Sequence, residues 1–454
     1  MPSIIITLFA FNPFYFIHYS DPQIGRNAQT VPYCSLAVNQ ISRMAPAPGF
    51  LIVCGDLADD PTNQSTVLGQ WRICDSLFDL LPMPKYYTSG NNDLGYANEG
   101  CWTPSQLALY RGFWGPDYYA LDRDSCRLIA LNSTLLDTYT GHACYTYSLE
   151  QDSFLRTELA SIPANAFRHV FLFFHFPLYL SSPTEGNSGT NVDRPRRDTL
   201  LADLVKYNIS SVFTGHLHYD LMNFYGPALL ESGLPTCETG IGSCGYRVVK
   251  VYRNGIETYV VWLSAPSDTV PMNQIVQAAV QSETLQAGTP FSFGCTVDSV
   301  NFPDWRGLTY QWVFKDGDTV NTYAGTHTYA DTGHFQILFA AYKAPHLAAL
   351  YRIPVVVTTG QEVTENINDR PNKTDFRVIS SVVKNGFIYE LPDNGAVSID
   401  LYQSNGRLVL SRNLGSQPPG KHRFEFEQPL SAGIYFARLT SGNSTVMKKL
   451  VIIR

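Results

Sequence analysis

Two histidines separated by one residue follow a short apolar run, in the stretch Val-Phe-Thr-Gly-His-Leu-His at 212–218. Residues two apart in an extended loop point the same way, so His216 and His218 can face one site. Gly215 lets the backbone turn sharply before them. A lone His-x-His is more often a pair of surface histidines. Further ligand-type residues at equivalent places are needed to make it a metal or catalytic site.

Four such residues occur upstream, each just after an apolar run that has the character of a buried strand. They are, with the runs that precede them, Asp21 (14–19), Asp56 (50–54), Asn91 (85–88) and His175 (170–174). Functional residues of open α/β sheets gather at the carboxyl ends of the strands, so we expect all six side chains to converge. Carboxylate, amide and imidazole donors together suit Mn, Fe or Zn better than Ca or Mg.

Asp56 is well suited to bridge two ions, because one carboxylate can give an oxygen to each. Two ions ~3.5–4 Å apart can bind the attacking and leaving oxygens of a phosphoryl displacement and lower the pKa of a bridging water. The residue types therefore point to two-metal phosphoester chemistry.

The elements that must position these residues alternate in type along the first part of the chain. Helical spacing separates the apolar runs, which predicts an α/β architecture. The predicted helices cover 28–44, 67–80, 151–160 and 199–206.

The pattern changes after about residue 265, where no helical period remains. Residues 266–358 contain short β-type runs and turns, which predict a β-sandwich of immunoglobulin size. Residues 359–375 are polar and turn-rich, as expected of a linker. Residues 376–454 alternate again, with Asn405-Gly406 as a strong hairpin signal. We expect the boundary after Ala265 to cut few contacts, and residues 1–265 to be active alone.

Composition narrows the function classes. A chain of 454 residues has room for two to four domains, and its net charge of -7 argues against a nucleic-acid-binding surface. No apolar stretch is long enough to be a transmembrane segment. We interpret residues 1–13 as an incomplete leader, since Ile4 to Phe11 is apolar but no basic residue precedes it and no cleavage site follows.

The nine cysteines lack the paired spacing of a zinc site. The odd count leaves at least one free thiol, and Cys54, inside an apolar run, is predicted to be buried and free. Disulfides are predicted for Cys237/Cys244, which bracket a Gly-rich loop, and as further bridges for Cys34/Cys74 and Cys101/Cys144.

Taken together, the motifs of residues 14–265 resemble the calcineurin-like metallophosphoesterases, whose fold is a two-sheet β-sandwich flanked by helices. The motifs are Asp21-x-Gln23, Gly55-Asp56, Gly90-Asn91-Asn92-Asp93, His175 and Gly215-His216-Leu217-His218. The resemblance implies two groups of metal ligands. The first metal would take Asp21, Asp56 and His218, and the second Asp56, Asn91, His175 and His216.

Two positions depart from the family pattern. Gln23 stands where a histidine usually binds the first metal, which implies a weaker ligand there. The Asp-Pro-Gln form, with Asn132-Ser133 and the strand 245–251, resembles the branch of CSTP1-like phosphatases. Asn92 stands where the family has a histidine that protonates the leaving group, and asparagine cannot give up a proton at neutral pH.

The two later modules also have resemblances. Residues 312–318 and 327–329 resemble PKD domains. Residues 402–409, 432–439 and 447–454 resemble the C-terminal sorting domain of the type IX secretion system. That second resemblance implies export by the type IX machinery and a secreted or bacterial cell-surface location.

We therefore expect a secreted or surface metallophosphoesterase that hydrolyses phosphate mono- or diesters with two divalent or mixed-valence ions (Mn, Fe or Zn) and a bridging hydroxide. Asp56 and Asn92 are the expected catalytic residues. Asn92 and Arg197 are candidates to contact the substrate phosphate, although the basic turn around Arg197 is more typical of a solvated surface. The alternative is a surface binding protein on a decayed phosphoesterase fold. Gln23 and Asn92 favour that alternative, and the intact second-metal ligands oppose it.

Overall fold

The computed structural model describes residues 11–60, 62–95, 103–162, 168–233 and 241–359, together with most of the strands between 377 and 452. The chain divides into two compact units, Met1–Gly360 and Gln361–Arg454. No helix among the described residues is long and apolar enough to cross a membrane.

The first unit begins with an alternation of strands and helices, as the sequence predicts. Its elements up to the predicted boundary are β1 (Phe14–Tyr19), α1 (Thr30–Ser42), β2 (Leu51–Cys54), α2 (Gln64–Phe78), β3 (Lys85–Thr88), α3 (Asn91–Leu94), α4 (Pro104–Trp114), β4 (Tyr119–Arg123), β5 (Cys126–Ala130), α5 (Ser133–Leu136), α6 (Tyr145–Ser161), β6 (His169–Phe173), α7 (Arg196–Lys206), β7 (Ser211–Thr214), β8 (Leu221–Tyr225), β9 (Ala228–Ser232), β10 (Gly245–Tyr252) and β11 (Gly255–Trp262).

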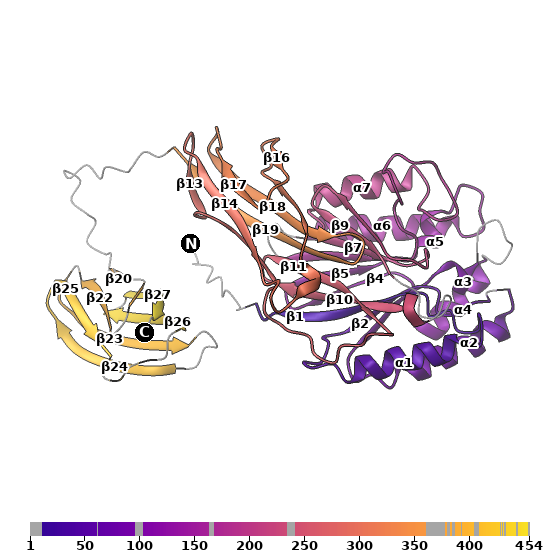
Figure 1. Cartoon of the computed structure of the whole chain (residues 1–454), viewed down its shortest axis with the longest axis horizontal. Helices are drawn as coiled ribbons and strands as arrows, with labels where there is room; N and C mark the ends of the chain where they lie inside the picture. Colours follow the sequence, from indigo (N-terminus) through magenta and orange to yellow (C-terminus); the bar gives the residue numbers. More distant parts are fainter. Residues whose placement is uncertain are drawn as a thin grey trace. The chain divides into compact units, whose positions relative to one another are not determined.

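Two sheets pack face to face and helices cover their outer faces (Figure 1). One sheet contains β3, β2, β1, β10 and β11 in that order, and the other has the order β4-β5-β6-β7-β9-β8. In Figure 1, α1 and α2 lie on one side of the strands and α6 and α7 on the other. The two-sheet sandwich flanked by helices that the family resemblance implied is confirmed.

The strands read as near-continuous apolar runs because both of their faces are buried. Phe16 of β1 belongs to the core between the two sheets, where it stacks on Phe50 with ring centroids 4.6 Å apart. Its neighbours Tyr15 and Ile17 point the other way, into the core beneath α1 and α2. Because side chains alternate between two cores, apolar residues are favoured along the whole strand, and the buried His18 is an exception in β1.

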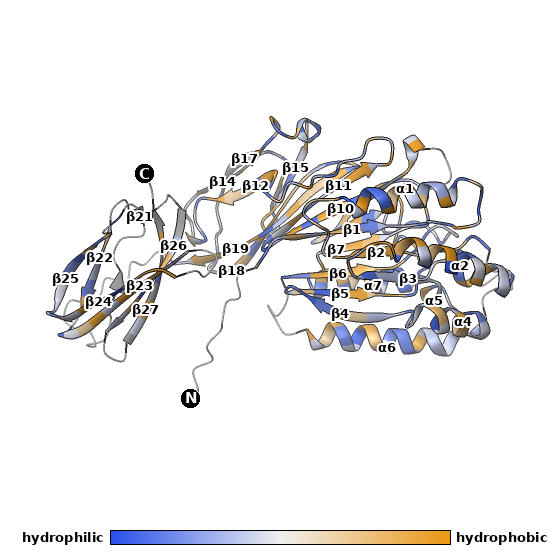
Figure 2. Cartoon of the chain, turned by 90° about the horizontal axis from the view of Figure 1, so that it is seen from below, coloured by the Kyte–Doolittle hydropathy of each residue, from blue (hydrophilic) through white to orange (hydrophobic). Residues whose placement is uncertain are grey.

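The helices, by contrast, are buried along one face only. Figure 2 shows hydrophobic and hydrophilic stretches alternating along α6. The buried residues of α6 recur at the three- and four-residue spacing of one helix face, and they are Ser148, Gln151, Leu155 and Leu159.

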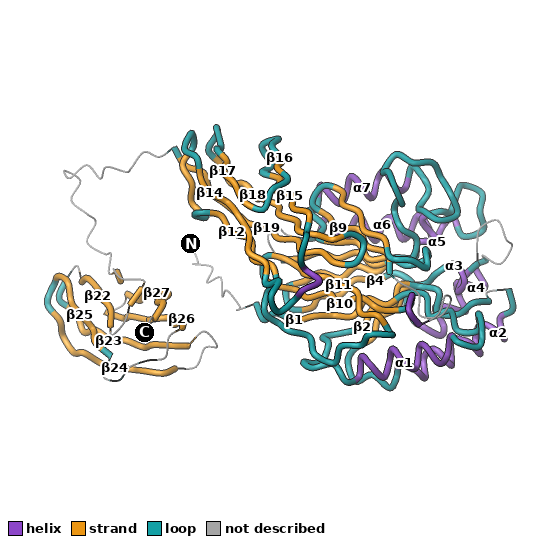
Figure 3. Tube along the Cα trace, viewed as in Figure 1, coloured by secondary structure: helices purple, strands orange, loops and turns teal. Residues whose placement is uncertain are grey.

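Residues 266–358 form the predicted β-sandwich, but they are not a separate body. Their strands are β12 (Val276–Val280), β13 (Thr284–Gln286), β14 (Phe291–Val297), β15 (Thr309–Val313), β16 (Thr319–Val320), β17 (Ala324–His327), β18 (Gly333–Lys343) and β19 (Leu347–Thr358). β19 pairs antiparallel with β11, so one sheet runs in the order β16-β15-β18-β19-β11-β10-β1-β2-β3 (Figure 3).

The expectation that few contacts cross the boundary after Ala265 is therefore wrong. Residues 255–259 of β11 are in register with residues 347–351 of β19. The buried Glu257 carboxylate accepts hydrogen bonds from the backbone N–H groups of Ile275 and Val276, at 2.7 and 2.8 Å, and from the Tyr351 hydroxyl at 2.9 Å. Spacing along the sequence could not reveal this pairing, because β11 and β19 lie far apart in the chain.

The second unit is all-β, as predicted. Its strands are β20 (Arg377–Val378), β21 (Val382–Val383), β22 (Gly386–Leu391), β23 (Gly395–Gln403), β24 (Leu408–Gln417), β25 (Gly420–Glu425), β26 (Gly433–Ser441) and β27 (Ser444–Ile452). They form sheets of order β20-β22-β25 and β21-β27-β26-β23-β24 around an apolar core that includes Ile399 and Leu439. The predicted Asn405-Gly406 turn lies outside the described residues.

The cysteine predictions have mixed outcomes. Cys34 and Cys74 are buried free thiols, so the bridge predicted between them is wrong in this structure. Burial raises the pKa of both thiols, that of Cys34 to about 12. Cys54 is buried and free, as predicted. Cys101 and Cys237, one partner in each remaining pair, lie outside the described residues.

Candidate metal centre

Five of the six ligand-type residues that follow the strands form two overlapping groups. The ligand atoms of Asp56, His175 and His216 lie within 4.8 Å of one another, and so do those of Asp21, Asp56 and His218. Asp56 is the residue common to both groups. The structure thus brings together residues that the family resemblance assigned to the two metals, and Asn91 Oδ1 lies beside the second group, 3.1 Å from His175 Nε2.

The backbone at this site is strained. Five non-glycine residues adopt positive φ, namely Asp21 (51°), Gln23 (41°), Asp56 (53°), His216 (73°) and His218 (57°). A left-handed conformation at such residues costs about 1–3 kcal/mol each and persists only where the surroundings enforce it. Here the loops brace one another: the backbone N–H of Gln23 donates to the Asp56 carbonyl at 2.9 Å, and that of His216 donates to the Asp21 carboxylate at 3.0 Å.

Three glycines allow the ligand side chains to approach the backbone. A Cβ at Gly90 would lie 2.1 Å from Asp56 Oδ1, and one at Gly215 would lie 2.6 Å from Asp21 Oδ2. A Cβ at Gly55, where φ is 80°, would lie 2.5 Å from His175 Nδ1. Any side chain at these positions would displace a ligand, which explains why each motif contains a glycine.

In the second group, each imidazole is oriented by one nitrogen and presents the other. His175 Nδ1 lies 2.8 Å from the Cys54 carbonyl and therefore carries the proton, which leaves Nε2 toward Asn91 Oδ1 (3.1 Å) and Asp56 Oδ1 (3.2 Å). His216 Nε2 lies 2.8 Å from the Gly189 carbonyl. Histidines that bind metals usually donate their other N–H in this way.

The electrostatics of this group favour a cation. Burial lowers the pKa of His175, but the adjacent Asp56 carboxylate outweighs burial and the pKa rises to about 9. Burial would raise the pKa of Asp56, yet its neighbour His175 brings it below the usual value. Burial and the nearby His175 lower the pKa of His216 to about 4. The pocket thus stabilises one positive charge among its carboxylates, as a bound metal would supply.

The first group includes a buried amide oxygen that suits a cation as a ligand. Gln23 Nε2 lies 3.0 Å from His218 Nε2 and 3.2 Å from Asp56 Oδ2. Gln23 Oε1 is buried with no hydrogen-bond partner among the described residues. The two ends of an amide exchange places by a half turn, which would aim this oxygen at the first group. Carboxylate, imidazole and amide donors suit the ions that the sequence indicated.

The turn of residues 91–93 positions the Asp56 carboxylate. The backbone N–H of Asn92 donates to Asp56 Oδ1 at 2.8 Å, and Asn92 Nδ2 donates to Asp56 Oδ2 at 3.0 Å. Asp93, which sequence reasoning did not single out, accepts hydrogen bonds from the Trp71 indole and from the backbone N–H groups of Leu57 and Gly90. The signal for Asp93 was an acidic residue three positions after Gly90, the spacing of a capping box.

The structure does not support the predicted contact between Arg197 and a substrate phosphate. Its side chain is completely buried, and it donates to the carbonyl oxygens of Leu178 (3.3 Å) and Glu185. It therefore anchors the loop that leads to Gly189. The basic turn gave no hint of this, because only the tertiary fold turns the first residues of α7 inward.

Ser133 is a supporting residue for His175. Its hydroxyl accepts hydrogen bonds from the backbone N–H groups of His175 (3.2 Å) and Phe176 (3.0 Å). Asn132 just before it caps the short helix α5 and donates to Asp117 at 2.8 Å. The Asn-Ser pair thus fixes the position of the strand end that carries His175.

Comparison with known proteins places each region in a family. Residues 14–220 match the family model of the calcineurin-like phosphoesterases, residues 275–345 that of the PKD domain, and residues 383–453 that of the secretion system C-terminal sorting domain. Curated relatives include the serine/threonine-protein phosphatase CPPED1 of Danio rerio, 28% identical over 265 residues, which are 54% of this chain and 83% of the relative. The human protein of that name is 25% identical over 260 residues, 53% and 80% of the two chains.

Similar solved structures include a dimetal phosphatase from Danio rerio, with 15% identity and a TM-score of 0.45 over 56% of this chain and 98% of the other. Another is the purple acid phosphatase PPD1 from yellow lupin (Lupinus luteus) seeds, with 13% identity and a TM-score of 0.43 over 59% of this chain and 57% of the other. The motif residues meet within residues 14–220, and this region of the chain is a calcineurin-like phosphoesterase domain.

Proposed function

We propose that this protein is a two-metal phosphoesterase that hydrolyses phosphate mono- or diesters outside the cell. The observation that carries the proposal is the position of Asp56, whose carboxylate belongs to both ligand groups. A carboxylate shared in this way holds two cations close enough to act on one phosphate.

The ligand sets follow from the two groups. Asp21, Asp56 and His218, with the Gln23 amide, would hold the first ion. The second would be held by Asp56, Asn91, His175 and His216. When bound, Mn, Fe or Zn ions would stabilise negative charge on the phosphoryl group and provide a nucleophile from water.

The chain's own residues orient the reaction and limit its scope. Asn92 Nδ2 donates one hydrogen to Asp56, and its second amide hydrogen can bond to a phosphoryl oxygen. An amide cannot protonate a departing alkoxide at neutral pH, so Asn92 serves as a hydrogen-bond donor. Substrates whose leaving groups are already stable anions should therefore react best.

Two findings support more specific expectations. The CPPED1 relatives are named as serine/threonine-protein phosphatases, which supports phosphate monoesters as one substrate class to test. The match of residues 383–453 to a secretion system sorting domain supports export by the type IX machinery to the cell surface or beyond.

The test is hydrolysis of nitrophenyl phosphate and bis-nitrophenyl phosphate by the chelator-treated full-length protein after addition of Mn, Fe or Zn. We expect activity that depends on added metal, and its loss in His175→Ala and Asp56→Asn. His334→Ala, an exposed histidine of β18, is the matched control and should behave as the wild type. Metal-independent turnover, or an active and metal-loaded His175→Ala, would contradict the proposal. A wild type that holds well under one ion per chain would support the decayed-site alternative instead.

A further inference from the structure

A buried carboxylate connects the metal-ligand loop to the PKD domain. Asp220 lies two residues after His218, and its side chain is 2% exposed. One oxygen receives a hydrogen bond from Arg247, and the other lies 2.9 Å from Nδ1 of His346. A carboxylate can only accept, so His346 Nδ1 carries the shared proton. His346 lies between β18 and β19, in the β-sandwich of residues 266–358 that contains the PKD match and is called the PKD domain below.

Arg247, which donates to Asp220, also has hydrogen-bond partners on both sides of the domain boundary. On the phosphoesterase side, its guanidinium pairs with Glu231 at 2.9 Å and donates to the Thr258 hydroxyl at 3.1 Å. On the PKD side, it donates to the carbonyl oxygens of Pro345 (3.2 Å) and His346 (3.4 Å). The side chains of Arg247, Asp220 and Glu231 are all nearly inaccessible to solvent. Most polar atoms of this buried network have partners, with Arg247 Nε and Glu231 Oε1 the ones that lack a hydrogen bond among the described residues, and such a network favours one arrangement of its members.

Asp220 lies at the end of the loop that carries His216 and His218, and the backbone of this loop is strained. His216 and His218 both have positive φ, and such backbone needs restraint on both sides to persist. At the start of the loop, the Ser232 hydroxyl donates to the Gly215 carbonyl at 2.6 Å. At its end, Asp220 supplies a restraint that reaches into the PKD domain.

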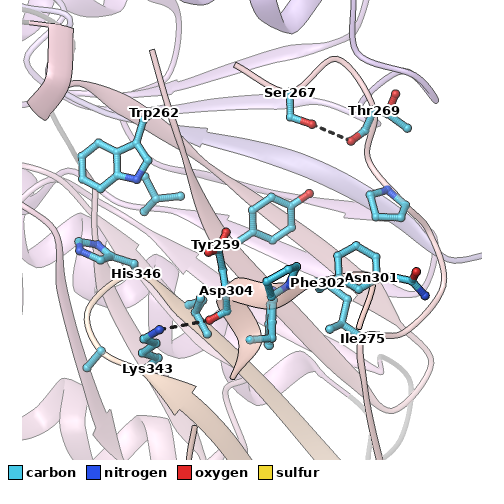
Figure 4. A pocket seen from close by; sticks show the side chains of 16 residues that line it. Tyr259, Trp262, Ser267, Thr269, Ile275, Asn301, Phe302, Asp304, Lys343 and His346 are labelled. Atoms are coloured by element: carbon cyan, nitrogen blue, oxygen red, sulfur yellow. Dashed lines mark hydrogen bonds between the residues drawn. The ribbon is translucent and has the colours of Figure 1, made fainter. Parts of the chain in front are cut away.

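His346 can be changed without disturbing a core. Its side chain is 49% exposed and lines a cavity of about 680 Å³ between β11 and the PKD domain (Figure 4). In Figure 4 its ring lies beside that of Trp262, and the two ring centroids are 5.3 Å apart. Lys343 lines the same cavity from the same hairpin, and its ammonium donates to the Asp304 carbonyl at 3.4 Å.

We propose that the PKD domain is part of the support of the first metal site, and that His346 is a positioning residue for His218 through Asp220. The inference rests on the proposed two-metal function. It assigns the PKD domain a role in metal binding although that domain supplies no ligand. Removal of the hydrogen bond from His346 should loosen the His218 end of the loop and leave the second site intact.

The test is calorimetric titration of chelator-treated full-length proteins with Mn²⁺. The binding event that disappears in His218→Ala identifies the first site. We expect His346→Ala to weaken this event about tenfold, the lower end of the effect of losing a supporting partner of a metal ligand. The second event and the melting temperature should not change. His346→Asn, which keeps an amide hydrogen near the position of Nδ1, should restore most of the affinity, and Lys343→Ala should match the wild type.

The outcomes separate the two claims. A wild type that binds no Mn²⁺ would overturn the proposed function and this inference together. Two normal binding events in the wild type and in His346→Ala would overturn the inference alone. Equal weakening of both events with a lowered melting temperature would show a general structural role, which also contradicts the inference.

Discussion

The substitution Gly90→Ala should disturb the ligand geometry of this site and leave the fold intact. The φ and ψ of Gly90, -111° and -178°, are extended values that alanine adopts without strain, so the effect must be steric. The new Cβ would lie 2.1 Å from Asp56 Oδ1 and 2.3 Å from the Asp56 backbone nitrogen. Ordinary contacts of this kind are not shorter than 3.0 Å, so the Asp56 carboxylate must move by roughly 1 Å.

A displacement of that size exceeds what a metal site tolerates. Metal–ligand distances hold to about 0.2 Å, and a 1 Å misplacement of a reacting group costs about 10²-fold in rate. We therefore expect kcat/KM to fall about 100-fold or more and both ions to bind more weakly, because Asp56 belongs to both groups. The overpacking itself should cost about 1–3 kcal/mol, which a domain of ordinary stability survives.

The assay combines metal content after dialysis, kcat/KM on nitrophenyl phosphate and thermal unfolding. Gly112→Ala is the matched control, since Gly112 lies exposed within α4 and a Cβ there would meet nothing within 4 Å. That control should be fully active and more stable by about 0.8–1 kcal/mol. A folded Gly90→Ala protein with normal metal content and activity within threefold of the wild type would refute the placement of Asp56 between two ions.

Three further predictions address catalysis, domain coupling and pH. Asn92→His should raise the rate on alkyl phosphates more than on aryl phosphates, because a general acid contributes ~10²–10⁴-fold where the leaving group is poor; parallel dependence on leaving-group pKa in both proteins would count against it. Arg352→Met should lower the free energy of unfolding by about 3 kcal/mol in denaturant titrations, because Arg352 of the PKD strand β19 donates to three carbonyls of the phosphoesterase domain, at 2.7 to 3.0 Å; the exposed Arg306→Met is the control, and equal effects would argue against coupling. Burial raises the pKa of Asp137 to about 7, so the folded state binds its proton more tightly and stability from this group is lost as pH rises from about 4 to 7; Asp137→Asn should flatten that dependence, and an unchanged pH profile of unfolding would exclude the assignment.

Site residues could be predicted from the sequence where their position follows from the local pattern of apolar residues. His175 could be predicted because it ends a run of buried strand residues, and Asp56 because a glycine and an apolar run precede it. The pattern of burial on both faces of β1 and β2 also follows from their largely apolar character.

Residues whose role depends on distant partners could not be predicted. Asp220 is separated from His346 by 126 positions, and nothing in its neighbourhood marks it as a buried carboxylate. Arg197 sits in a polar, basic turn typical of a surface, yet α7 directs it inward. Such outcomes depend on how sheets and helices pack, which the patterns of a single sequence do not reveal.

The shared sheet also has a consequence for how the protein is made. During synthesis, the eight residues of β11 are complete before the strand that covers their open edge, which begins only at Leu347. Until then β11 offers a row of unpaired N–H and C=O groups, the feature that leads chains to aggregate edge to edge. A ribosomal product that ends before Leu347 keeps this edge open to its neighbours. A full-length chain pairs the edge within its own molecule, so we expect β19 to limit association of nascent chains through β11.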